Sequence, residues 1–294
     1  LGNRTPEWAH VPYVASPGSK EKMSKRKIDK YRTSPQFQKL FELGDQVLSR
    51  IGVDPKSNEL SPVMVAYYRQ VGFLPAGVLN ALVRLGWSLD DQTEILSLAD
   101  MKRKFTLDRV IKSAAGLDPD KMLSFQSHWM SELPADEKLR GCLSMLKQAR
   151  LIDSEHDDET KAKVASILEL AADRIRVFGD IFQLDEFFVA DEELRIDDRN
   201  FQKRVVKPEN AVSLLHELRQ RLCDLENFAT QPLHELLQAF VADKKVKVGD
   251  IFPALRLCVT GKAQGADLFR TLELLGKSRV FRRLDRAIAL AESQ

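Results

Sequence analysis

Apolar residues recur at three- and four-residue steps through almost the whole chain from about residue 60 onward, the spacing that lines one face of an α-helix. The segment 74–87 shows the pattern clearly, with Pro75 suited to a first helical turn and Gly86 to a helix end. Further helices are expected at 117–130, 134–152, 157–176, 209–228, 266–276 and 277–290. This spacing predicts a mainly α-helical protein.

One short stretch departs from this pattern. The segment 10–15, HVPYVA, reads as a β-strand that ends at the turn residues Ser16, Pro17 and Gly18. A strand is stable only as part of a sheet, and no later segment reads as its partner. We therefore expect a single strand that has lost the rest of its sheet.

Composition narrows the class of protein. The chain has 294 residues, of which 44% are hydrophobic and 30% charged, as in an ordinary globular protein. No apolar run approaches the roughly 20 residues of a membrane span. Cys142, Cys223 and Cys258 are scattered without metal-binding spacing, and the histidines are equally dispersed. We expect a cytoplasmic protein with no membrane partner and no zinc site.

The net charge of +2 conceals an uneven distribution. The segments 1–32 and 277–286 are basic, whereas 185–198 is acidic. Separated basic segments suit a long polyanion that the protein touches at several points. The same segments are also compatible with ordinary solvated faces, and charge alone leaves both interpretations open.

The pentapeptide KMSKR at 22–26 matches the signature loop of class I aminoacyl-tRNA synthetases. Lysine ammonium groups on a mobile loop can stabilise the negative charge that develops on a departing pyrophosphate. The hydroxyl of Ser24 can add a donor, and its small side chain lets the loop backbone approach closely. Five residues alone are a modest signal, so the flanking sequence decides the matter.

Four blocks in order resemble glutamyl-tRNA synthetases. The first, TPEWAHVPYVASPGSKEKMSKRK, contains the signature loop, and the second, VMVAYYRQVGFLPAGVLNALVRLGWS, covers 63–88. The others are the segments 105–130 and 253–288. Bacterial-type glutamyl-tRNA synthetases read the anticodon with an α-helical domain, whereas the related glutaminyl enzymes use β-barrels. The helical C-terminal half therefore resembles the bacterial type. The resemblance spans nearly the whole chain.

The resemblance implies a fold and an activity. The expected fold class is mainly α: the end of a Rossmann-type catalytic domain with one strand and the KMSKR loop, an α-helical stem-contact domain, and an α-helical anticodon-binding bundle. The corresponding ranges are 1–60, 61–152 and 153–294. The parent protein would be a monomer that activates glutamate with ATP and Mg²⁺ and transfers it to tRNA-Glu.

The resemblance also implies roles for individual residues. Lys22, Met23, Ser24, Lys25 and Arg26 would bind ATP, with Lys22 and Lys25 as the catalytic pair. Arg256 would contact an anticodon base, since a guanidinium can pair with a base edge or stack on its face, and Arg174 is a looser candidate for a second base.

The helix expected at 277–290 carries a stripe of arginines. Arg279, Arg282, Arg283 and Arg286 fall at i, i+3, i+4 and i+7, so they share one helix face that could hold tRNA phosphates. An ordinary soluble face would mix lysine with glutamate, which favours RNA contact.

Other residues are predicted to be structural. Asn80 and Trp87 are expected to pack or to cap a helix. Thr260 and Gly261 are expected to shape the turn after the helix that contains Arg256. The core is predicted to include Leu79, Leu82 and Leu85.

The chain departs from the family pattern in three places. The segment 27–60 is longer than usual and contains a possible helix, Ala266 replaces a proline, and the family's His-x-Gly-His stretch is absent. We therefore expect the chain to start within the catalytic domain and to be inactive alone. The alternative is a non-catalytic helical RNA-binding protein derived from a synthetase.

Overall fold

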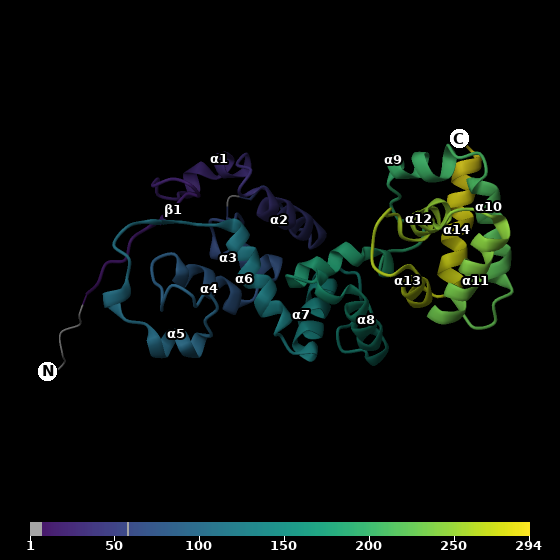
Figure 1. Cartoon of the computed structure of the whole chain (residues 1–294). Coiled ribbons are helices and arrows are strands. Elements are labelled where there is room, and N and C mark those ends of the chain that lie inside the picture. The colour runs from purple at the N-terminus through teal and green to yellow at the C-terminus, as the bar shows by residue number, and fades with distance from the viewer. Residues whose placement is uncertain (1–7, 58) are drawn as a thin grey trace. The chain divides into compact units, whose positions relative to one another are not determined.

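The computed structural model describes residues 8–57 and 59–294, so residues 1–7 of the predicted catalytic remnant and residue 58 of the predicted insertion lie outside it. The chain forms two compact units (Figure 1). The first unit comprises the chain up to Glu155 together with Asp173–Phe182, and the second comprises His156–Ala172 and Gln183–Gln294. The structure confirms the expectation of a mainly helical protein.

Helices make up most of both units. Those of the first unit are α1 (Ile28–Arg32), α2 (Gln38–Arg50), α3 (Val65–Val71), α4 (Pro75–Arg84), α5 (Leu98–Lys104), α6 (Pro119–Ser131) and α7 (Ala135–Gln148). Those of the second are α8 (Asp158–Ala171), α9 (Asp198–Phe201), α10 (Ala211–Cys223), α11 (Thr230–Lys244), α12 (Val248–Thr260), α13 (Leu268–Leu275) and α14 (Lys277–Glu292). Short 3₁₀ segments lie at Lys25–Lys27, Leu107–Arg109, Ala172–Arg174 and Phe178–Phe187, and a π-helical turn at Gln202–Val206.

The helix boundaries follow the sequence signals at several ends. Asp118 caps α6, its side chain accepting hydrogen bonds from the backbone N–H groups of Asp120 and Lys121. The helix predicted at 157–176 ends early, at Ala171. Ala172 adopts a positive φ of 51°, which ends the regular turn.

The expectation of an unpartnered strand is wrong. Strand β1 (Val14–Ala15) pairs in parallel with β2 (Ala115–Gly116), and the two form a two-stranded sheet. The N–H of Leu117 extends the pairing by donating to the Ala15 carbonyl at 3.0 Å. A two-residue strand has too little periodicity to be recognised in a sequence, so β2 escaped detection.

The prediction that Leu79, Leu82 and Leu85 are core is also wrong. Leu79 is 39% exposed and Leu82 is 41% exposed, and Leu85 is half-buried. Helix α4 instead packs on α6 through Gly77, where an added Cβ would lie 3.0 Å from the Cα of Gln126. The close contact is made by the face that carries small side chains, which leaves the leucines on the outside.

Asn80 and Trp87 have the structural roles that the sequence suggested. The fully buried Asn80 side chain donates to the Glu94 carbonyl at 2.7 Å and accepts from the Leu96 N–H at 3.0 Å. The Trp87 indole donates to the Thr106 carbonyl at 3.1 Å, and its ring packs with Leu96. Both residues fold the segment after α4 back onto that helix.

The helix predicted within the segment 27–60 exists as α2, which packs against α3. At the contact, an added Cβ on Gly44 would lie 2.4 Å from the buried ring of Tyr67. The Tyr67 hydroxyl donates a hydrogen bond to the Leu40 carbonyl. A glycine is therefore required for the observed spacing of these two helices.

The second unit is a helical bundle in which α14 packs against α10 and α12. One face of α10 is buried at Leu215, Leu218 and Leu222, each with no exposed surface. Leu284 and Val280 of α14 are likewise fully buried. This packing fixes which face of α14 turns toward the segment that precedes α9.

Candidate functional site

The basic loop at 22–26 returns toward strand β1. The N–H of Met23 donates to the Val14 carbonyl at 3.0 Å, and the N–H of Ser16 donates to the Glu21 carbonyl at 2.8 Å. Lys22 lies opposite Ala15 in an antiparallel bridge. These backbone bonds hold the start of the loop beside the strand.

The positive charges of this region fall into two groups. Lys27 and Lys30 both pair with Glu21, and hydrogen bonds from these two lysines lower the pKa of its carboxyl to about 2. Lys22 and Lys25 are exposed. Within the described part of the chain they carry no ion pair or side-chain hydrogen bond, and the exposed Arg26 side chain has none either. The motif cations thus remain available, whereas Lys27 and Lys30 share the carboxylate of Glu21.

Ser24 shapes the end of the loop. Its side chain accepts a hydrogen bond from the N–H of Arg26 at 3.3 Å and so caps the short 3₁₀ turn of Lys25–Lys27. The hydroxyl therefore has a structural use in addition to the donor role predicted for it. The half-buried Met23 lies beside it.

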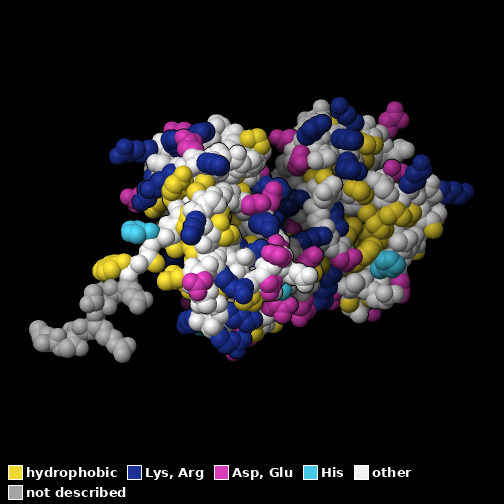
Figure 2. Space-filling model, turned by 60° about the vertical axis from the view of Figure 1, so that its left-hand side comes forward, with side chains coloured by type: hydrophobic (Ala, Val, Ile, Leu, Met, Phe, Trp, Pro, Cys, Tyr) yellow, Lys and Arg dark blue, Asp and Glu magenta, His cyan; other side chains and the backbone are white. Residues whose placement is uncertain are grey.

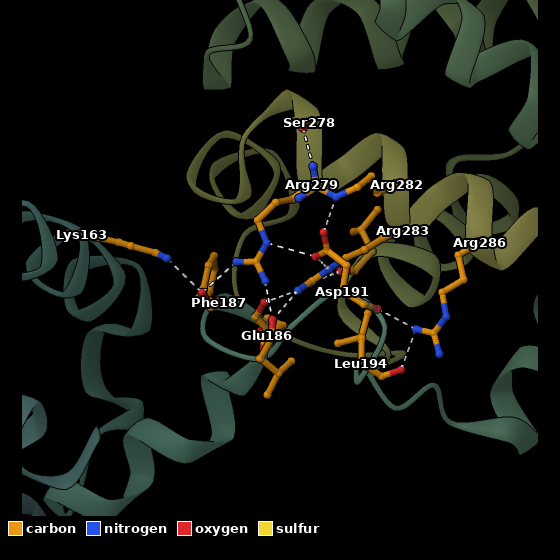
Figure 3. Close-up of polar contacts among 12 residues, drawn as sticks. Lys163, Glu186, Phe187, Asp191, Leu194, Ser278, Arg279, Arg282, Arg283 and Arg286 are labelled. Carbon is orange, nitrogen blue, oxygen red and sulfur yellow. Dashed lines mark hydrogen bonds and ion pairs between the residues drawn. The ribbon is translucent and has the colours of Figure 1, made fainter. Parts of the chain in front are cut away.

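The arginine stripe on α14 surrounds the carboxylate of Asp191 (Figure 3). Oδ1 of Asp191 accepts hydrogen bonds from Nε of Arg283 at 2.7 Å and Nε of Arg279 at 3.1 Å, and Oδ2 accepts from Nε of Arg282 at 2.7 Å. Burial opposes ionisation of Asp191, but the three guanidinium groups outweigh it and lower the pKa of the carboxyl. Asp191 is therefore held as an anion.

Three arginines of the stripe also bind backbone carbonyls, most of which lie in the segment 186–194. The pairs are Arg279 with Phe187 and Val189, Arg283 with Glu186 and Val259, and Arg286 with Asp191 and Leu194, at 2.6 to 3.1 Å. Lys163 of α8 adds a bond to the Phe187 carbonyl at 3.1 Å. The stripe thus fastens this segment to α14.

The four arginines differ in exposure, which bears on their predicted role. The Arg283 side chain has no exposed surface and Arg279 retains 21%, whereas Arg282 retains 56%. Arg286 is also exposed. The prediction that all four contact RNA stays a prediction, but the burial of Arg283 favours an internal role for that residue.

The two arginines predicted to read bases lie in different units. Arg256 is half-buried in the middle of α12, in the second unit, and an added Cβ on Gly265 would lie 2.9 Å from its Nη1. Arg174 is exposed at the end of the 3₁₀ turn after α8, and belongs to the first unit. Their roles as base-reading residues stay predictions.

The turn after α12 has the structural character predicted for Thr260 and Gly261. The Thr260 hydroxyl donates to the Arg256 carbonyl at 2.8 Å. Gly261 has a φ of 76°, and an added Cβ would lie 2.0 Å from the Arg195 carbonyl oxygen. The turn therefore locks the end of the Arg256 helix against the chain that leads into α9.

Sequence reasoning missed Asp191 and Lys262. The Nζ atom of Lys262 lies 2.7 Å from Oδ1 of Asp185 and 2.6 Å from Oε2 of Glu186. The available signal was the acidic segment at 185–198, whose charge complements α14 within the same unit. Because the acidic and basic segments were interpreted as separate surfaces, their pairing was not predicted.

On the face seen in Figure 2, Lys and Arg side chains are spread over both units instead of gathering in a single patch. Among the described residues, no three His, Cys, Asp or Glu side chains come together as a possible metal site. Within the same residues, no helix has the length and apolarity needed to cross a bilayer.

Comparison with known proteins places these features in a family. Residues 137–288 match the family model described as an anticodon binding domain. The chain belongs to the anticodon-binding domain family.

Curated proteins with similar sequences include glutamate–tRNA ligases. The glutamate–tRNA ligase of Moorella thermoacetica is 28% identical over 98% of this chain and 51% of its own length. That of Geobacter sulfurreducens is 32% identical over 78% of this chain and 47% of its own length. The chain spans about half the length of the curated relatives it matches, and it corresponds to their C-terminal portion.

A solved structure is similar to almost the whole chain. The glutamate–tRNA ligase of Elizabethkingia meningosepticum, crystallised in complex with its amino acid, is 26% identical, with a TM-score of 0.73 over 98% of this chain and 52% of its own. The resemblance to glutamyl-tRNA synthetases inferred from the sequence is therefore confirmed.

Proposed function

We propose that this chain supplies the signature loop and the tRNA-binding part of a glutamate–tRNA ligase. The ligase would activate glutamate with ATP and transfer it to tRNA-Glu in the cytoplasm. The observation that carries the proposal is the family match over residues 137–288, in a chain whose 22–26 loop keeps its motif cations exposed.

The loop is proposed to act on the phosphates of ATP. Lys22 and Lys25 would meet the charge that moves onto the departing pyrophosphate, with Arg26 beside them. Exposed cations suit this task, because they need not break an internal ion pair before they bind a phosphate. No residue of the chain is assigned to the expected Mg²⁺, since the described residues offer no cluster of ligands.

The second unit is proposed to hold the anticodon arm. Arg256 would read a base, while Arg282 and Arg286 would meet phosphates with the donors that remain exposed. Arg279 and Arg283 would support this surface indirectly, because their hydrogen bonds to backbone carbonyls hold the segment 186–194 in place.

The three predicted domains are retained within this proposal. Residues 1–60 would complete the catalytic domain, 61–152 would touch the tRNA stem, and 153–294 would bind the anticodon. For a protein that binds phosphates, the logarithm of the affinity falls linearly with the logarithm of the salt concentration, and the slope grows with the number of phosphates contacted.

The test is retention of labelled tRNA-Glu by the chain on filters, at salt concentrations between about 50 and 200 mM. We expect a complex that weakens steeply with salt and that excess unlabelled tRNA-Glu displaces better than tRNAs with other anticodons. Equal displacement by every tRNA would remove the anticodon role, and absence of any complex would remove the proposal.

A further inference from the structure

A buried tyrosine hydroxyl lies behind the basic loop. Tyr31 of α1 is only 2% exposed, and its hydroxyl accepts a hydrogen bond from the backbone N–H of Ser24 at 3.0 Å. The side-chain hydroxyl of Ser16 donates to the same oxygen at 3.4 Å. One atom of α1 is thus bonded both to the end of β1 and to the middle of the 22–26 motif.

The position of this hydroxyl is set by the helices beyond it. The Tyr31 ring packs on Phe37 with centroids 5.5 Å apart, and Phe37 packs on Phe41 of α2 at 6.3 Å. Arg32, next to Tyr31, donates to Asp45 of α2 at 2.8 Å, and its guanidinium carbon lies 4.5 Å from the Phe41 ring centroid. These contacts fix α1 on α2, so the hydroxyl cannot move without them.

A second tie holds the loop from its other side. Glu21 precedes the motif and binds Lys27 and Lys30, which follow it. The exposed cations Lys22 and Lys25 lie between these attachment points. The loop is therefore held at its backbone and by its flanks, while its charged side chains point to solvent.

We propose that Tyr31 is a positioning residue for the basic loop, and that α1 and α2 form the support through which it acts. The hydrogen bond to Ser24 holds the loop in one conformation before a phosphate chain arrives, which lowers the cost of ordering it on binding. The inference rests on the proposed function only in naming phosphates as the ligand.

The first experiment measures amide hydrogen exchange in the complete 294-residue chain. Tyr31→Phe removes the hydroxyl and keeps the ring. We expect the Ser24 amide to exchange roughly three- to tenfold faster, the range that one neutral hydrogen bond implies. The control is Tyr68→Phe, because Tyr68 is also buried and its hydroxyl donates to the Pro62 carbonyl at 2.8 Å. It should leave the Ser24 amide unchanged.

The second experiment adds inorganic tripolyphosphate and follows the amide signals of residues 22–26 by NMR. We expect saturable shifts in the unmodified chain and in Tyr68→Phe. In Tyr31→Phe we expect the same shifts at a concentration several-fold higher, since the loop must then be ordered during binding. Sodium chloride at matched ionic strength should not produce these shifts.

The two experiments separate the two claims. Faster exchange in Tyr31→Phe without any response to tripolyphosphate would uphold the positioning role and count against phosphate as the ligand. Unchanged exchange in Tyr31→Phe would overturn the positioning role, whatever the loop binds. If this variant fails to fold, the unmodified chain decides: a Ser24 amide that exchanges as fast as in an unstructured peptide overturns the inference.

Discussion

The carboxylate of Asp191 lies 2.7 Å from the Nε atom of Arg283, a guanidinium whose side chain has no exposed surface. Arg283 belongs to α14, and Asp191 precedes α9 by several residues, so this bond joins distant parts of the sequence. Because both groups are largely withdrawn from water, each offsets the cost of burying the charge of the other. The pair anchors the segment 186–194 to the bundle.

Asp191→Asn should therefore destabilise the chain strongly. It leaves Arg279, Arg282 and Arg283 clustered without their anion, and we expect a loss of about 3 to 5 kcal/mol in the free energy of unfolding at neutral pH. The measurement is urea denaturation followed by circular dichroism. Asp285→Asn on the same helix is the control, because Asp285 is half-exposed in its pair with Arg219 and should cost less than about 1 kcal/mol.

The difference in the free energy of unfolding between the original chain and Asp191→Asn should depend on pH. Since folding lowers the pKa of Asp191, its ionised form stabilises the folded chain above the ordinary aspartate value of about 3.9. The contribution is lost as the pH falls through the lower folded value. The gap between the original chain and Asp191→Asn should shrink below about pH 4, and a gap that widens there would contradict this account.

Gly44→Ala should also destabilise the chain, through packing instead of charge. The new methyl group would lie 2.4 Å from Cε2 of Tyr67, whose ring is buried and whose hydroxyl binds the Leu40 carbonyl. We expect a loss of about 1 to 3 kcal/mol, even though alanine is the better helix former. Gly249→Ala, where an added Cβ meets nothing within 4 Å, is the matched control. A stabilised Gly44→Ala chain would show that α2 does not pack on α3 as described.

Arg282→Ala should separate RNA contact from stability. Its side chain is 56% exposed, and Asp191 keeps two other arginine donors, so the free energy of unfolding should change by less than about 1 kcal/mol. The slope of log affinity for tRNA against log salt should fall by about 1, as one phosphate contact is lost. An unchanged slope would place Arg282 outside the RNA surface.

The sequence predicted the arginine face but not what it meets. The i, i+3, i+4, i+7 spacing correctly placed the four arginines on one side of α14. Spacing within a helix carries no information about the partner across it, and the partner proved to be Asp191 within the same unit. The acidic segment was visible, yet only tertiary packing could pair it with α14.

The errors in the first unit have the same origin. The leucines of α4 suggested a core stripe, but the helix packs through Gly77 and Asn80, because α6 approaches too closely for large side chains. Strand β2 is too short to show alternation and is defined by its pairing with β1. In contrast, a proline that marks a helix start acts locally, and the prediction for Pro75 was confirmed at α4.

Binding of tRNA-Glu to Arg256→Ala tests the central claim most directly. Arg219→Ala is the control within the same unit, because Asp285 already neutralises Arg219 at 2.7 Å. On filters at low salt, Arg256→Ala should bind tRNA-Glu about five- to 150-fold more weakly, the cost of about 1 to 3 kcal/mol for one base contact. Arg219→Ala should stay close to the original chain. Equal binding by the original chain and Arg256→Ala, or no binding by either, would contradict the account.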